Sequence, residues 1–155
     1  MSEKTTQKRK MKSASRLYAV QALFQMETTG QTVEQVCAEF ETHRFGAVYE
    51  GDEMVDGNPD LFRALVDRAV DDQARIDQMT DRALVAKWPI ARIDPTLRAV
   101  FRTAGAELLL GETPPKVVIV EFVQIAEAFF PDGKEAKFTN GVLDHMAREA
   151  QPEEF

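Results

Sequence analysis

The chain has 155 residues and a formal net charge of −7, with 44% hydrophobic and 29% charged residues. This composition is typical of a globular domain with a real core, and no apolar run approaches the ~18 residues that a membrane span requires. The single cysteine, Cys37, excludes an intrachain disulfide and a multi-cysteine metal site. Residues 1–12 lack the apolar stretch of a secretory signal, so we expect a cytoplasmic protein.

The charge is distributed unevenly along the chain. Residues 1–16 carry six basic residues and one acidic residue, Glu3, which gives them a net charge of +5. Because the whole chain has a net charge of −7, the remaining residues have a net charge of −12. A basic segment on an acidic body can attract phosphates. The alternative is a solvated leader that only aids solubility.

The N-terminal third of the chain predicts two helices. Residues 1–12 show no apolar period, and we expect them to form a disordered basic arm. A first helix should begin near Ser13, a good N-cap residue, and end at Gly30. Thr32 followed by Gln35 is the capping-box pattern of a second helix.

The middle of the chain predicts a loop and then a long helix. Residues 46–58 keep no period and predict an irregular loop. Asn58 followed by Pro59 is an N-cap signal for a helix. We expect this helix to break before Thr80 and to resume as a short helix to Lys87.

The next helix carries an unfavourable glycine. It should begin at Asp94-Pro95, which repeats the cap-and-proline signal, and end at Gly111. Gly105 lies in its middle, where glycine costs about 1 kcal/mol relative to alanine. A close crossing of two helices is the expected reason for it.

Two further helices complete the domain, from Pro115 and over 134–150, before a polar tail at 151–155. No segment alternates with a period of two. We therefore predict an all-α protein of six or seven helices in a single domain over 13–150.

Patterns of enzymes and metal sites are absent from the sequence. His43 and His145 lie on different predicted helices without ligand spacing, and the glycines do not form a phosphate loop. We expect neither catalysis nor a metal or cofactor, and interpret the chain as a binding protein.

Phe138 is the residue whose position suggests a ligand. It follows Lys137 at the start of the last helix, where a ring could stack on an unpaired base beside phosphate contacts. The alternative is that Phe138 packs into the core. In the same stretch we expect Val142, Leu143 and Gly141 to pack against other helices.

Several stretches together resemble the NusB family of transcription antitermination proteins. They are Arg16–Gln25 (RLYAVQALFQ), Ile93–Leu108, Pro115–Glu121 and Lys137–Asp144 (KFTNGVLD). The resemblance implies two packed three-helix bundles, the NusB-like fold. It also implies binding of single-stranded boxA-type RNA from ribosomal RNA leaders. The partners it implies are NusE, a small-subunit ribosomal protein, and the antitermination complex on RNA polymerase.

The resemblance further implies which residues bind. Its RNA-binding residues are basic or aromatic: Lys8, Arg9, Lys10, Lys12, Arg16, Lys116, Phe129, Lys137 and Phe138. Its protein-partner residues are Phe24 and Leu97. We expect the basic arm to supply salt-dependent attraction to phosphates, while Phe138 supplies stacking.

Some positions depart from the family pattern. Only two cations remain where the first helix of the family is arginine-rich, and Glu127 stands where a lysine is usual. These departures support an alternative: a protein-interaction module, NusE-binding or homodimeric, with weak or lost RNA binding. A NusB-like domain of a methyltransferase is less plausible, because 155 residues leave no room for a cofactor-binding domain.

Overall fold

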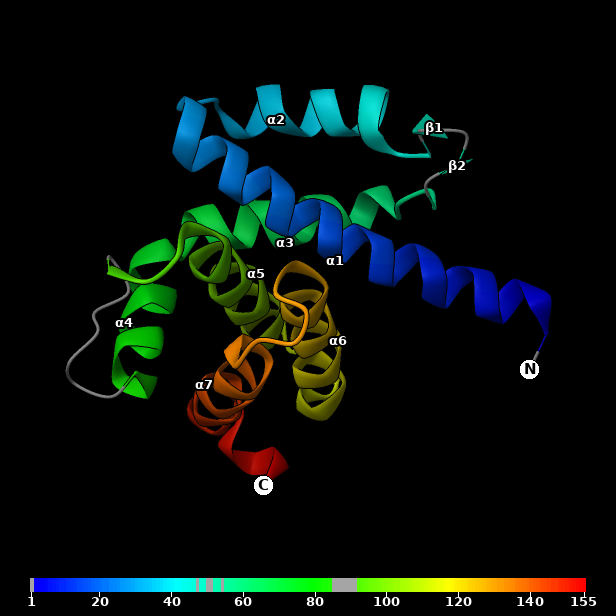
Figure 1. Cartoon of the computed structure of the whole chain (residues 1–155). Coiled ribbons are helices and arrows are strands. Elements are labelled where there is room, and N and C mark those ends of the chain that lie inside the picture. The colour runs from blue at the N-terminus through cyan, green and yellow to red at the C-terminus, as the bar shows by residue number, and fades with distance from the viewer. Residues whose placement is uncertain (1, 47, 50–51, 54, 85–91) are drawn as a thin grey trace. The chain divides into compact units, whose positions relative to one another are not determined.

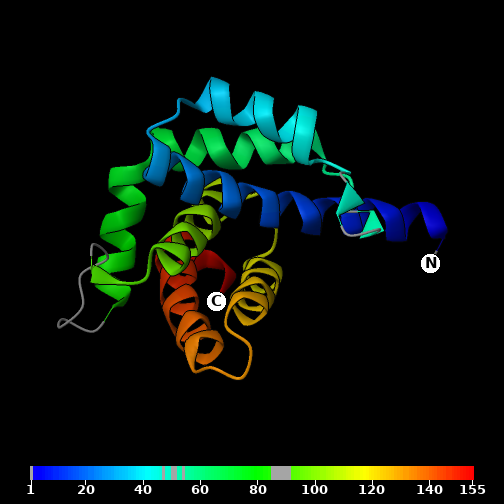
Figure 2. The same ribbon diagram turned by 45° about the horizontal axis from the view of Figure 1, so that its top comes forward.

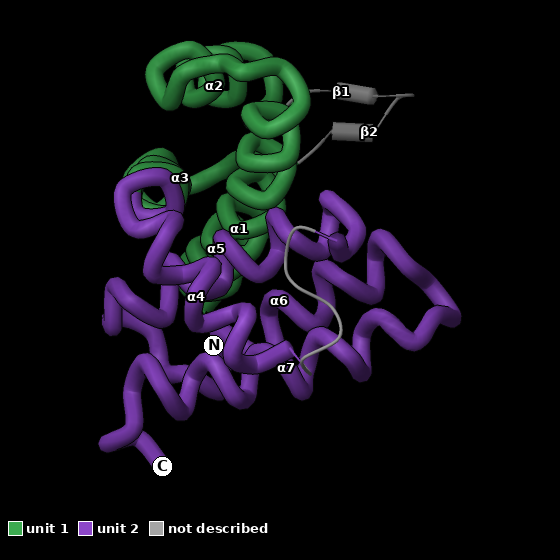
Figure 3. The backbone as a smooth tube through the Cα atoms, turned by 90° about the vertical axis from the view of Figure 1, so that its left-hand side faces the viewer, with its two compact units in different colours: residues 1–67 green, residues 68–155 purple. Residues whose placement is uncertain are grey.

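The computed structural model describes residues 2–46, 48–49, 52–53, 55–84 and 92–155. The chain divides into two compact units, Met1–Asp67 and Arg68–Phe155, which Figure 3 shows in green and purple. Both units are built almost entirely from helices, and the described residues contain seven α-helices. The all-α prediction is therefore confirmed.

Unit 1 holds the N-terminal helices and a small hairpin. Its elements are α1 (Glu3–Thr29), α2 (Val33–Glu39), a π-helix (Phe40–Arg44), β1 (Val48–Tyr49), β2 (Asp52–Glu53) and most of α3 (Pro59–Asp71). The two short strands pair antiparallel, with Val48 opposite Glu53. The expected irregular loop over 46–58 therefore contains a hairpin.

Helix α1 begins ten residues earlier than expected. Ser2 caps it, with its hydroxyl accepting the amide hydrogen of Thr5 at 3.2 Å, so residues 3–12 are helical rather than an unstructured arm. These residues are exposed apart from Met11, and the N-terminal turns extend away from α2 in Figures 1 and 2. The missing apolar period thus indicates a helix without a buried face, since lysine, arginine and glutamine favour helix.

The predicted end of α1 and the predicted start of α2 are confirmed. Gly30 ends α1 with φ 74°, and its amide donates to the carbonyl of Met26 at 2.8 Å. Thr32 and Gln35 form both hydrogen bonds of the capping box. Beyond α2 the helical path continues as a wider π-helix instead of fading, with the Phe45 amide donating to the carbonyl of Phe40 at 2.9 Å.

Aromatic rings fill the core of unit 1. The ring of Phe45 stacks on Tyr18, with centroids 4.8 Å apart, and meets Phe62 edge-on at 5.1 Å. The Tyr18 hydroxyl donates to the carbonyl of Val55 at 2.7 Å. These contacts hold the residues just before α3 against α1.

Unit 2 contains α4 (Gln73–Ala83), α5 (Pro95–Leu110), α6 (Pro115–Phe129), α7 (Glu135–Ala150) and a 3₁₀ turn (Pro152–Glu154). Helices α5, α6 and α7 all contact one another, and α4 packs on α5 and α7 (Figures 1 and 2). The Asp94 cap is confirmed, since its carboxylate accepts the Thr96 amide hydrogen at 2.7 Å. Gly111 ends α5 with φ 72°, also as predicted.

The predicted break before Thr80 is wrong, because the helix breaks at Asp72, between α3 and α4. Asp72 has a bent backbone (φ −107°, ψ 22°), and aspartate tolerates such positions well. Thr80 lies inside α4, where its hydroxyl donates to the carbonyl of Ile76 at 2.8 Å and so stays satisfied. The expected continuation to Lys87 lies outside the described residues.

The two mid-helix glycines of unit 2 differ. At Gly105 a Cβ would lie 2.5 Å from Cγ2 of Ile76 and 3.3 Å from Cε of Met146, so the expected close crossing is confirmed. At Gly141 a Cβ would meet nothing within 4 Å. The predicted packing role of Gly141 is therefore wrong, whereas Val142 and Leu143 are buried.

The end of the chain is not simply a polar tail. Gln151 is buried, and its side-chain amide donates to the carbonyl of Leu108 at 2.8 Å. This bond attaches the end of α7 to the end of α5. Within the described residues, no helix combines the length and apolarity needed to cross a membrane.

Candidate nucleic-acid interface

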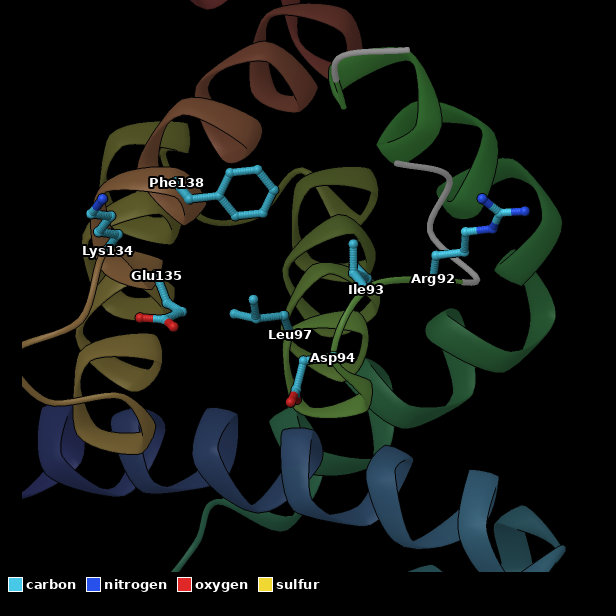
Figure 4. A pocket seen from close by; sticks show the side chains of 7 residues that line it. All are labelled: Arg92, Ile93, Asp94, Leu97, Lys134, Glu135 and Phe138. Atoms are coloured by element: carbon cyan, nitrogen blue, oxygen red, sulfur yellow. The ribbon is translucent and has the colours of Figure 1, made fainter. Parts of the chain in front are cut away.

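A cavity of about 410 Å³ opens in unit 2 between the beginnings of α5 and α7 (Figure 4). Its lining residues are Arg92, Ile93, Asp94, Leu97, Lys134, Glu135 and Phe138. The volume is within the ~300–1,000 Å³ range of small-ligand sites. Two of the predicted site residues, Leu97 and Phe138, therefore meet in one hollow.

Helix starts position this cavity. Asp94 caps α5 and places Leu97 in its first turn, with Phe101 one turn further on. Lys134 precedes α7, and its carbonyl accepts the Phe138 amide hydrogen at 3.1 Å, which fixes Phe138 at the end of the first turn. Both helices thus direct their first turns toward the same space.

Phe138 is partly packed and partly open. Its ring meets Phe101 edge-on, with centroids 6.1 Å apart and planes at 65°, while 42% of the residue is exposed. Phe138 thus packs partly into the core, and its role in stacking on a base stays a prediction. Contact with Phe101 limits the motion of the ring, and its open side faces the cavity in Figure 4.

The cavity carries charges of both signs. Arg92 and Lys134 are exposed cations at its edge. The Asp94 carboxylate is engaged by the Thr96 amide. The Oε2 atom of Glu135 is buried and has no hydrogen-bond partner among the described residues. This atom lies against Gly133, where a Cβ would collide with it, so the oxygen is covered and does not open into the cavity.

The other predicted residues of unit 2 lie apart from one another. Lys137 is exposed beside Phe138. Lys116 is exposed at the start of α6, and Phe129, 38% exposed, ends the same helix. Thirteen positions separate these two residues, about 20 Å along a helix axis. Neither lines the cavity.

In unit 1 the predicted cations share helix α1. Lys8, Arg9, Lys10 and Lys12 are all exposed. Because lysines four positions apart lie on one helix face, Lys8 and Lys12 form a stripe that Lys4 extends. The helical state of residues 3–12 therefore turns an expected flexible arm into an ordered row of charge.

Arg16 does not belong to that exposed row. It is only 4% exposed, so its guanidinium has little surface for RNA, contrary to the expected role. The resemblance grouped Arg16 with the other cations, but burial depends on the surrounding residues, which the sequence does not show.

The two predicted partner residues also differ in accessibility. Phe24 on α1 is 39% exposed and can be reached by another protein. Leu97 is 6% exposed and forms part of the cavity wall instead. A direct contact with a partner is therefore more readily made by Phe24.

Sequence patterns did not predict five of the lining residues as parts of a site: Arg92, Ile93, Asp94, Lys134 and Glu135. A signal was present in the spacing, because Leu97 and Phe101 on α5 and Lys134 and Phe138 on α7 are both i, i+4 pairs. The sequence could not show that these two pairs face each other.

The described residues show no arrangement for metal chemistry, since no group of three or more His, Cys, Asp or Glu could hold an ion there. Burial raises the pKa of the Cys37 thiol to about 11. Cys37 is therefore protonated at neutral pH and is a poor nucleophile.

Comparison with known proteins gives one consistent family. Residues 13–148 match the NusB family model. The transcription antitermination protein NusB of Maricaulis maris is 45% identical over 147 residues, which cover 94% of this chain and 91% of that protein. NusB of Agrobacterium fabrum is 41% identical over 143 residues, covering 92% and 86%.

Solved structures agree with this result. The structure of T. maritima NusB has a TM-score of 0.73 and 30% identity, with 92% of this chain and 95% of that chain covered. A structure of the antitermination factors NusB and NusE in complex with dsRNA has a TM-score of 0.71. Its 24% identity, over 88% of this chain and 96% of that one, supports similarity of fold alone.

Proposed function

This chain belongs to the NusB family, and we propose that it is a transcription antitermination factor that binds boxA-type RNA of ribosomal RNA leaders together with NusE. In this proposal it acts in the cytoplasm, within the antitermination complex on RNA polymerase. Its role is binding and not catalysis, as for the antitermination proteins it resembles.

One observation supports RNA binding above the others. The Phe138 ring is held on one side by Phe101 and open on the other, with Lys137 exposed next to it. A fixed ring is a good platform for an unpaired base, and a neighbouring ammonium group attracts the phosphate. This favours single-stranded RNA, because bases in a duplex are already stacked.

The cation stripe on α1 supports the same function. Successive lysines on the stripe are about 6 Å apart along the helix axis. Like charges at this spacing repel each other slightly, so phosphates that pair with them would stabilise the helix. The acidic remainder of the chain repels RNA elsewhere and suits a basic partner such as a ribosomal protein.

The test is a titration of the full chain with a single-stranded boxA-type RNA and with the same sequence as a duplex, each with and without NusE. We expect the single strand to bind more tightly and NusE to increase its affinity. Tighter binding of the duplex would contradict the stacking argument.

A matched pair of variants measures what the Phe138 ring contributes to RNA affinity. Phe138→Ala should weaken single-strand binding by about 1–3 kcal/mol through lost stacking. Phe155→Ala is the control, because Phe155 is similarly exposed, at 44%, but lies at the chain end over Arg148. Equal RNA affinities of the two folded variants would refute the role of Phe138.

The second candidate is a protein-interaction module, NusE-binding or homodimeric, with weak or lost RNA binding. The burial of Arg16 and the exposed acid Glu127 on α6 favour it. Binding of NusE without measurable RNA binding in the same titration, or a dimeric mass in solution, would support this alternative.

A further inference from the structure

Gly141 is an unfavourable residue that the packing of unit 2 does not explain. It lies in the middle of α7, where every residue except proline favours a helix more than glycine does. Unlike Gly105, it makes room for no neighbour, because a Cβ here would meet nothing within 4 Å among the described residues. Gly141 is also exposed to solvent. An exposed glycine of this kind allows a ligand to approach the helix backbone closely.

The place of Gly141 on α7 relates it to two residues of the candidate interface. Successive residues of an α-helix point about 100° apart, so Gly141 points between the directions of Lys137 and Phe138, one turn further along. Side chains of a helix lean back toward its N-terminus and cover the residues three and four positions earlier. For position 141 these residues are Phe138 and Lys137. A side chain at this position would therefore lie over the surface between the ammonium group and the ring.

The missing side chain leaves that surface open between two groups of different chemistry. Lys137 is exposed, whereas Phe138 is 42% exposed and is held on one side by Phe101. A nucleotide combines a phosphate, which an ammonium group attracts, with a ring that stacks on an aromatic side chain. In order to touch both residues, a nucleotide has to lie across this surface.

The charges of this part of α7 favour RNA over a basic protein. Lys134 and Lys137 are both exposed, and they would repel the lysine or arginine of a partner. The two nearby acids of the helix are covered or paired. One carboxylate oxygen of Glu135 is buried, and Asp144 forms an ion pair with Arg148 at 3.0 Å. The surface therefore offers cations to a phosphate.

We propose that Gly141 is an RNA-binding position, where the sugar and phosphate of a nucleotide stacked on Phe138 pack against the backbone of α7, with Lys137 beside the phosphate. This rests on the proposed RNA-binding function and adds to it a residue that acts through the absence of a side chain. The helix is less stable than it could be because this surface has to stay open.

The test is a series of side chains of increasing size at position 141. Alanine and leucine are both good helix formers, so Gly141→Ala and Gly141→Leu should be at least as stable as wild type. Both full-length variants, with and without NusE, should nevertheless bind single-stranded boxA-type RNA more weakly. We expect a loss of about five- to hundredfold for leucine, the range lost with one stacked base, and a smaller loss for alanine.

Two controls connect the loss to the surface between Lys137 and Phe138. Ala74→Leu enlarges an exposed residue of α4, where no predicted RNA-binding residue lies, and should leave the RNA affinity unchanged. In a chain that already carries Lys137→Ala and Phe138→Ala, the groups that hold RNA over Gly141 are gone. Gly141→Leu should then lower the affinity little further. Urea unfolding of each variant shows that it folds and whether it is stabilised.

The possible results separate this inference from the proposed function. An RNA affinity that is unchanged in Gly141→Leu, or that falls equally in Ala74→Leu, overturns the role of Gly141 while RNA binding by the wild type still stands. A loss of NusE affinity in Gly141→Leu with unchanged RNA binding overturns it as well, because the open surface then serves a protein. If the wild type binds no RNA, with or without NusE, the proposed function fails and the role of Gly141 fails with it.

Discussion

Replacing Gly105 with alanine should destabilise the protein, although alanine is the better helix former. A Cβ at this position would lie 2.5 Å from Cγ2 of Ile76 and 3.3 Å from Cε of Met146. Carbon atoms in favourable contact are about 3.5–4.0 Å apart, so the first contact overlaps by roughly 1 Å. Cγ2 is attached to a β-branched carbon and cannot move without turning the whole side chain.

The magnitude follows from two opposing effects. Overpacking a core in this way costs about 1–3 kcal/mol. Replacing glycine with alanine in the middle of a helix stabilises the helix by about 1 kcal/mol, which opposes this cost. We expect Gly105→Ala to lower the free energy of unfolding by about 1 kcal/mol. Gly141→Ala in α7 has the same helix effect without any steric contact, and should raise it by about 0.5–1 kcal/mol.

Urea unfolding, followed by circular dichroism, measures both changes. A double mutant adds a control, because Ile76→Ala removes Cγ2 and should make the alanine at position 105 favourable. The reasoning is refuted if Gly105→Ala stabilises as much as Gly141→Ala, or if its effect is the same with and without Ile76.

Three more predictions concern the arm, the cysteine and an ion pair. Deleting residues 1–12 should weaken RNA binding and make the slope of log K against log salt concentration shallower by about 0.7 for each lost phosphate contact. An unchanged slope would show that these residues do not contact the RNA. Burial raises the pKa of Cys37 from 9.0 to about 11, so the unfolded chain loses the thiol proton at a lower pH than the folded chain does. The stability is complete below pH 9 and should fall by at most about 2–3 kcal/mol up to pH ~11, a decline that urea unfolding should not show in Cys37→Ala. Asp77→Ala removes both carboxylate contacts of Arg102, at 3.0 and 2.9 Å between half-buried side chains, and should cost about 1–3 kcal/mol. The same change at Asp144, in an exposed ion pair, should cost under about 0.5 kcal/mol, and equal losses would contradict the argument from burial.

Helix ends were the most predictable part of the fold. The cap at Asp94, the capping box of Thr32 and Gln35, and the glycine ends at Gly30 and Gly111 all follow from the sequence. Each involves only residues within one helical turn, so local chemistry decides it. The succession of such signals was enough to predict an all-α chain, whereas the family fold was implied only by the resemblance of several stretches to the NusB family.

Contacts between helices were much less predictable. The sequence assigned Gly141 to helix packing, but a Cβ there would meet nothing within 4 Å, and the resemblance placed Arg16 among the RNA-binding cations, but Arg16 is buried. The spacing of apolar residues shows which residues share one face of a helix, but not which other element packs against that face. Likewise the absence of a buried face was misread as disorder at residues 3–12, which are helical.

The sequence by itself determined the helices, most of their ends and the aromatic residue at the start of the last one. Only the tertiary structure decided that Phe138 and Leu97 line one cavity and that a carboxylate oxygen of Glu135 is buried against Gly133. The physical reason is the range of the interactions. A helix cap depends on neighbours along the chain, whereas a cavity depends on residues about 40 positions apart, which only the packing of α5 against α7 brings together.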